Sequence, residues 1–248
     1  MGRSYFTLFT ALLFSVQVNA AVVLTSKTKD GEQTSMFQNN TMVTVEHGQT
    51  RMIVQQKSNT CTTFNHQSKK YMQMDCKKLM GMFNQMTTGI MDMANAMVPP
   101  EMRQSANAQQ IPPLDLVKAG SGKYQGYSID KYQIKIGPDV AMEYWVSKEV
   151  LAMVAKEFDY KKFDALFAKN EPTPDGSDPM AMVKAQIDKK EKSLEDKGMI
   201  LKRISYLEKG PKAPPEVEET HVSTKKFNIK KYMPTKDYKK VSRMQDMM

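Results

Sequence analysis

The chain has 248 residues, of which 40% are hydrophobic and 25% charged, a composition typical of a globular protein and not of a disordered one. Basic residues outnumber acidic ones by 36 to 27, giving a net charge of +9, and methionine is over-represented at 22 residues. Three histidines and two cysteines are too few for a multi-ligand zinc cluster or a disulfide-dense miniprotein, and they argue against an enzyme.

The first twenty residues have the pattern of an export signal. Arg3 precedes an apolar run over Tyr5–Val16, and Val18–Ala20 is a small-residue cleavage motif. The run is too short for a stable transmembrane helix, although an uncleaved signal anchor is the alternative. We therefore expect cleavage after Ala20, leaving a single domain over 21–248 in the periplasm or outside the cell.

Short strands are predicted between Val22 and Asp75, where apolar and β-branched runs alternate with turn signals. Thr41–Glu46 and Gln49–Val54 flank His47–Gly48, which fits the two-residue type I′ turn of an antiparallel hairpin. The predicted register pairs Val43 with Met52 and Val45 with Thr50, which places Val43, Val45, Met52 and Val54 on one apolar face.

The two cysteines are predicted to form a disulfide. If Ser68 and Lys69 form a two-residue turn, Cys61 and Cys76 lie directly opposite each other in the next hairpin. An oxidising compartment favours the bond, and a loop of this length is stabilised by roughly 3 kcal/mol. Because the spacing is not that of a redox motif, we interpret the pair as structural, with buried free thiols as the alternative.

The segment at about 77–113 changes to a helical period and then to a polar, proline-rich loop. We interpret it as an insertion within the domain. Its apolar stripe consists of Met82, Met86, Ile90, Met93 and Met97. The stripe could cover a ligand or simply fill the core, and the sequence leaves both interpretations open.

The remainder of the chain alternates hairpins with helices. A hairpin is expected over Tyr127–Ile136 and Val140–Val146, after which Ser147 is a suitable N-cap for a helix to about Phe158. A second helix is predicted to start at Pro179 and to end before Gly198 in a left-handed conformation. The final predicted hairpin pairs Met199–Leu207 with Glu218–Ile229.

No catalytic or metal-binding motif stands out. His47, His66 and His221 lack the spacing of a metal site, and Lys118–Lys123 lacks the spacing of a phosphate loop. We therefore predict no enzyme, no metal and no cofactor, and export argues against nucleic acid as a partner. The lysine-rich tail from Lys225 to Lys240 is interpreted either as a solvated strand edge or as a contact with an anionic membrane surface.

The order of several weak motifs resembles a bacterial exported family of unassigned function that is related in shape to the periplasmic lipoprotein carriers. The motifs are Gln49–Val54, Thr60–His66, Lys69–Met74, Gly126–Tyr132, Glu143–Val146, Gly198–Arg203, Phe227, Tyr232–Pro234 and Tyr238–Lys239. The resemblance implies an α+β fold in which a strongly curved antiparallel sheet, an incomplete β-barrel, is covered on its concave face by helices and encloses an apolar cavity.

The predicted function is therefore a non-enzymatic binding protein for a lipid, an acyl chain or a lipidated protein. The residues expected to contact this hydrophobic ligand are Met52, Met72, Met74, Met82, Met86, Ile90, Met93, Met97 and Trp145. Two alternatives belong to other classes. Thioether pairs such as Met72 with Met74 could bind Cu(I) or Ag(I), and the protein could instead have a structural or chaperone-like role in the cell envelope.

Overall fold

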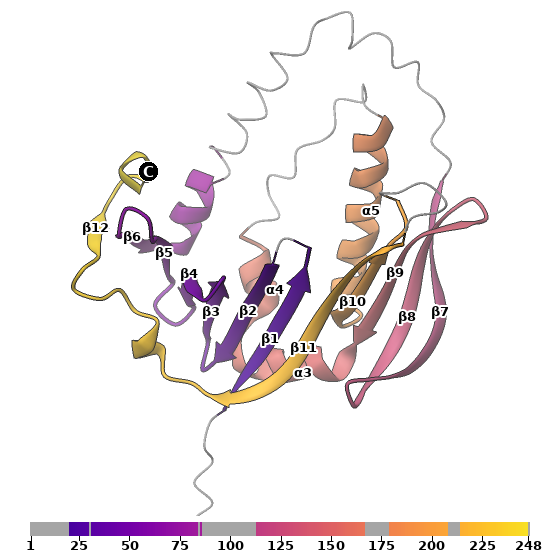
Figure 1. Cartoon of the computed structure of the whole chain (residues 1–248), viewed down its shortest axis with the longest axis horizontal. Coiled ribbons are helices and arrows are strands. Elements are labelled where there is room, and N and C mark those ends of the chain that lie inside the picture. The colour runs from indigo at the N-terminus through magenta and orange to yellow at the C-terminus, as the bar shows by residue number, and fades with distance from the viewer. Residues whose placement is uncertain are drawn as a thin grey trace, which may run out of the picture.

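A computed structural model of the chain describes residues 20–29, 31–83, 85, 113–166, 179–207 and 214–247. Twelve strands form one sheet in the order β12-β6-β5-β4-β3-β2-β1-β11-β10-β9-β8-β7 (Figure 1). All pairs are antiparallel except β12 with β6, and the two outer strands do not pair with each other. The fold is thus α+β with a large, unclosed, mixed sheet, which confirms the predicted class in outline.

Strands β1 to β6 form the predicted N-terminal meander, in which each strand pairs with the next along the chain. Both His47 and Gly48 have positive φ, at 49° and 76°, which confirms the predicted type I′ turn. The bounds are β1 Ala20–Thr28, β2 Gly31–Gln38, β3 Thr41–Glu46, β4 Gln49–Gln55, β5 Thr60–Asn65 and β6 Lys70–Asp75.

The predicted register of the β3–β4 hairpin is correct only next to its turn. Val45 pairs with Thr50 as expected, but a bulge follows, and Val43 then pairs with Ile53 and not with Met52. Because one extra residue moves every later side chain to the opposite face, Val54 lies away from Val43. The single apolar face predicted for this hairpin is therefore wrong, and both of its faces are buried.

A disulfide joins Cys61 and Cys76, but not by the predicted route. The loop between β5 and β6 has four residues, so Cys61 lies opposite Met74 in the ladder. Cys76 follows β6 and begins a helix over 76–83. The bond therefore attaches the start of this helix to β5, and it does not link two paired strand residues.

The second half of the sheet contains the predicted central hairpin and its helices. Ser147 caps α3 through a hydrogen bond that its Oγ accepts from the backbone N–H of Val150, as expected for this residue type. The bounds are β7 Leu114–Tyr124, β8 Tyr127–Ile136, β9 Asp139–Ser147, α3 Lys148–Glu157, α4 Tyr160–Asp164, α5 Pro179–Glu195 and β10 Met199–Ser205.

The last segments of the chain join the two halves. β11 (Glu216–Lys226) lies between β1 and β10, and the chain then passes through a short 3-10 helix, η1 (Ile229–Lys231). It reaches the opposite edge of the sheet, where β12 (Lys239–Val241) adds parallel to β6 and η2 (Met244–Met247) follows (Figure 1). Residues 227–247, which we name the C-terminal strap, thus connect the centre of the sheet to its β6 edge.

Three apolar clusters hold these layers together. The first, which we name the central cluster, unites α3, α4 and the 76–83 helix with strands from both halves; its fully buried members include Met72, Val150 and Leu201. The second lies between α5 and β7–β10 and contains Tyr144 and Leu194. The third lies under the C-terminal strap, where Phe227, Tyr232 and Tyr238 pack near residues of β1 to β5.

In the described part of the chain, no helix is both long and apolar enough to cross a membrane. Residues 1–19 of the predicted signal segment lie outside the described residues, as does most of the 77–113 insertion, whereas Ala20 is the first residue of β1.

Candidate functional site

Five of the predicted ligand-contacting residues meet in the central cluster. Met72 is fully buried, whereas Met52, Met74, Met82 and Trp145 are partly buried and pack against it. The other predicted residues, Met86, Ile90, Met93 and Met97, lie outside the described part of the chain.

The register of three strands explains how the methionines converge. Met52 on β4 pairs with Thr63 on β5, and Thr63 pairs with Met72 on β6. Because directly paired residues share a face, Met52 and Met72 lie in one row across the strands, and Met74 is on the same face two residues further along β6. The sheet therefore presents a row of thioethers to the 76–83 helix.

The 76–83 helix contributes residues that were not among the predicted site. Cys76, Leu79 and Met80 are 2%, 0% and 2% exposed, and Phe83 packs against the same cluster. Their spacing of three, four and seven residues from Cys76 is that of one helical face. This pattern, read from the cysteine onward, could have identified Leu79 and Phe83 from the sequence.

Trp145 belongs to the central cluster, but its ring is already engaged by the protein. Its Nε1 donates to Oε1 of Glu143 at 2.7 Å, and the ammonium groups of Lys131 and Lys202 lie 4.1 and 5.0 Å from the ring centroid. Tyr124 contacts the ring edge-on. Trp145 is therefore held in a polar network of cation–π contacts and a charge-assisted hydrogen bond.

Glu143 is the acceptor that fixes this network. Burial alone would raise the pKa of its carboxyl, but hydrogen bonds from Trp145 and Gln133 outweigh burial and hold the pKa below its usual value. The carboxylate therefore stays ionised and keeps the indole in a fixed orientation.

An apolar pocket lies beside the disulfide, between Cys76, Val54 and Phe163. Its volume is about 30 Å³, the space of a single water molecule, which is far below that of an acyl chain. The two larger pockets described below have mainly polar and charged linings.

The first of these larger pockets lies beside α5 and has a volume of about 550 Å³. At its base the hydroxyl of Tyr144 donates to Glu191 at 3.1 Å, and Arg203 lies 3.6 Å from Glu191 and 3.5 Å from Glu218. Burial raises the pKa of Glu191 despite the attraction of Arg203, and burial together with Glu191 raises the pKa of Tyr144. This pocket is lined mainly by charged side chains, among which Arg203 pairs with both Glu191 and Glu218.

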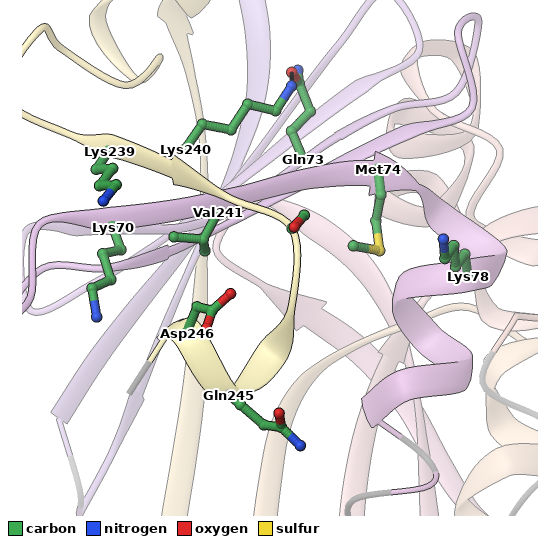
Figure 2. Close-up of a pocket in the computed structure, with 10 residues that line it drawn as sticks. Lys70, Gln73, Met74, Lys78, Lys239, Lys240, Val241, Gln245 and Asp246 are labelled. Atoms are coloured by element: carbon green, nitrogen blue, oxygen red, sulfur yellow. Dashed lines mark hydrogen bonds between the residues drawn. The ribbon is translucent and has the colours of Figure 1, made fainter.

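The second larger pocket is an open groove of about 940 Å³ at the β6 edge of the sheet, which we name the basic groove (Figure 2). It is bounded by β6, the start of the 76–83 helix, β12 and η2. Four lysines line it, Lys70, Lys78, Lys239 and Lys240, together with one acid, Asp246. Met74 and Val241 supply apolar surface within it.

The three histidines lie apart from one another. His47 is exposed at the β3–β4 turn, and His66 hydrogen-bonds the hydroxyl of Tyr238 and the carbonyl oxygen of Thr50, each at 2.6 Å. His221 lies on β11. Within the described ranges, no group of three or more His, Cys, Asp or Glu side chains is arranged to hold a metal ion.

No protein-family model matches the chain, and no curated protein is significantly similar to it.

Proposed function

We propose that the protein is a non-enzymatic, exported binding protein that holds a hydrophobic ligand at the central cluster, between the sheet and the 76–83 helix. The ligand is a lipid, an acyl chain or the acyl group of a lipidated protein. The observation that carries the proposal is the convergence of Met52, Met74 and Met82, all half-buried, around the fully buried Met72.

Several features of the fold support this assignment. Methionine is unbranched and polarisable, so a row of thioethers can adapt its shape to chains of different length. The disulfide fixes one end of the 76–83 helix on the sheet. We propose that the unclosed sheet is the incomplete barrel of the periplasmic carrier fold and that helices cover its concave face.

Export is part of the same proposal. The apolar run before Ala20 has the pattern of a cleaved signal, and the Cys61–Cys76 disulfide suits an oxidising compartment such as the periplasm.

Titration with a fluorescent fatty acid tests the proposal. The double variant Met74→Ala/Met82→Ala is expected to weaken uptake of the probe about tenfold, because each truncation removes buried apolar contact worth roughly 1 kcal/mol or more. Met233→Ala is the matched control, since Met233 is a partly buried methionine of the third cluster under the C-terminal strap. Its affinity should stay within about twofold of the unaltered protein.

Two outcomes contradict the proposal. One is that the unaltered chain takes up no fatty acid, and the other is that the control loses as much affinity as the double variant. Stoichiometric Ag(I) binding that disappears in Met72→Leu/Met74→Leu, without any fatty-acid uptake, would replace the lipid assignment with a thioether metal site.

A further inference from the structure

We propose that the basic groove binds a phosphate-bearing anionic group, and that this group is the headgroup of the ligand held at the central cluster. The first part stands on the groove alone, and the second part rests on the proposed function. The groove and the central cluster share two residues, Met74 and Val241, which line the groove and also pack against the apolar core (Figure 2).

The lysines of the groove are brought together from three segments of the chain. In the parallel pair of β12 and β6, Lys239 lies directly beside Lys70. Alternation along each strand puts Lys70 on the same face as Met74 and Lys239 on the same face as Val241. Lys78 reaches the groove from the first turn of the 76–83 helix. Lysines from three segments of the chain therefore line one groove.

This arrangement concentrates positive charge. Ammonium groups that line the same groove, such as those of Lys78, Lys239 and Lys240, repel one another. Within the described ranges neither Lys78 nor Lys239 forms an ion pair, and Lys240 donates to the neutral amide of Gln73 at 3.3 Å. A bound anion would relieve the repulsion.

The one acid in the groove does not balance these lysines. The carboxylate of Asp246 accepts two hydrogen bonds from the guanidinium of Arg243, at 3.0 and 3.2 Å. Asp246 is therefore neutralised by a partner outside the set of groove lysines. Among the described residues that line the groove, no acid pairs with Lys78, Lys239 or Lys240, so these three lysines keep the groove basic.

The walls of the groove are fixed in the folded protein. The carbonyl oxygen of Met247 accepts hydrogen bonds from Asn65 at the end of β5 and from Ser68 in the β5–β6 loop, at 2.7 and 3.1 Å. These bonds, with the β12–β6 pairing, hold η2 against the sheet edge. A site whose walls are ordered before binding loses less entropy when a ligand enters.

A phosphate suits this site better than a carboxylate. A phosphate monoester carries nearly two negative charges at neutral pH and three acceptor oxygens, so one group can contact several lysines at once. Lysine binds phosphate as a point charge and does not require a planar, two-pronged contact. Met74 and Val241 then provide an apolar surface for the carbon chain next to the phosphate.

Calorimetric titration of inorganic pyrophosphate into the folded chain at low ionic strength tests the site. Lys70→Gln/Lys239→Gln is expected to weaken binding about tenfold, the effect of losing roughly one charge-assisted contact. The matched control is Lys230→Gln/Lys231→Gln, which removes the same charge from two exposed lysines of η1 in the same strap. The control should bind within about twofold of the unaltered chain, because screened charges outside the groove act weakly.

Failure of the unaltered chain to bind pyrophosphate overturns the site. Equal weakening in the two double variants also overturns it, and it would assign the lysines to a solvated strand edge that prevents aggregation.

A second measurement separates a lipid headgroup from a free phosphate. Sedimentation with vesicles of phosphatidylcholine, with and without phosphatidic acid, should show binding that depends on phosphatidic acid and falls in Lys70→Gln/Lys239→Gln but not in the control. Pyrophosphate binding without groove-dependent vesicle binding would overturn the headgroup assignment and leave a site for a soluble phosphate. Uptake of the fatty-acid probe is measured separately on the same variants, so loss of the proposed function and loss of the phosphate site are distinguishable.

Discussion

The two halves of the sheet bury their faces in different ways. In the N-terminal half, alternate residues of β1 are buried on opposite faces, with Val22 and Leu24 in the central cluster and Ala21 and Val23 under the C-terminal strap. In the other half, α5 covers one face of β7–β10, and the outer strand β7 has a single buried residue, Leu114. One half is enclosed, and the other ends in a largely exposed strand.

The outer edges of the two halves also differ in whether another strand covers them. The β6 edge is covered by β12 and fixed by the disulfide next to it, whereas β7 pairs only with β8. An exposed edge with lysines is protected from aggregation by charge alone, but a paired edge also presents ordered groups to a ligand. Both proposed sites lie in the N-terminal half of the sheet, whose two faces and outer edge are covered by other segments of the chain.

The largest expected effect tests whether the two halves unfold as one unit. Phe37 is 2% exposed and packs on Phe158, so Phe37→Ala should lower the free energy of unfolding by about 3–5 kcal/mol. The only tryptophan, Trp145, lies on β9 in the other half. Because α3 contacts β1, β2, β8 and β10, urea unfolding followed by Trp145 fluorescence should shift as much as unfolding followed by circular dichroism. A fluorescence midpoint that stays unchanged would mean that the halves are independent.

The disulfide should have the next largest effect. Replacing both Cys61 and Cys76 with serine is expected to reduce the free energy of unfolding by about 3 kcal/mol, because the unfolded chain loses a covalent constraint. Urea unfolding of the variant is compared with that of the unaltered protein with and without a reductant. A reductant effect that persists in the serine variant would show that the loss does not come from this bond.

A close approach between β9 and β10 predicts a smaller effect. A Cβ at Gly198 would lie 2.6 Å from the carbonyl carbon of Ser147, so Gly198→Ala forces the backbones apart. The expected loss is about 1–3 kcal/mol in thermal or urea unfolding. Gly120→Ala is the control, since a Cβ there meets nothing within 4 Å and its positive φ of 157° is similar to the 158° of Gly198. Equal losses at the two positions would attribute the effect to backbone conformation.

The smallest expected effect is a pH dependence of the free energy of unfolding that arises from two glutamates of α5. Burial raises the pKa of both Glu191 and Glu195 in the folded protein. The folded state therefore binds these protons more tightly than the unfolded state does, and their contribution to stability increases as the pH falls from neutral toward 4.5. Glu143 and Glu219 have lowered pKa values in the folded protein, so their ionised carboxylates stabilise the folded state. This stabilisation is lost only as the pH falls below 4.5, the ordinary pKa of the group.

Urea unfolding at pH 7 and pH 5 checks this sign. The gain in stability at pH 5 should be smaller in Glu191→Gln than in the unaltered protein, because the glutamine does not titrate. An identical gain in the variant would contradict the assignment to Glu191.

Local rules predicted the local elements of this fold. The turn at His47–Gly48 and the Ser147 cap depend on residues close in sequence, and both are present. The disulfide also forms, although not by the predicted pairing of strand residues. The reason for Gly198 differs from the predicted left-handed stop, because the close approach of the Ser147 backbone excludes a side chain there.

Features that depend on contacts between distant residues could not be predicted from the sequence. The bulge in the β3–β4 hairpin depends on packing against both neighbouring layers, and nothing in the run from Thr41 to Val54 marks it. The pairing of β12 with β6 brings together lysines that are far apart in the chain, so the basic groove could not be predicted, although the lysine-rich tail itself was visible. Met72 and Met74 share one face of β6 because alternate residues of a strand do so, which is a local rule.

The position of β11 between β1 and β10 has a consequence for biosynthesis. The hydroxyls of Ser26 and Thr220 lie 2.9 Å apart although 194 residues separate them in the chain. The two half-sheets cannot join until β11 has been synthesised, and the strap, which follows β11, covers the apolar face of β1 to β5 only later. The inner edge of β1 therefore stays unpaired from the synthesis of β1 until β11 has been made, and it needs protection from aggregation during that interval.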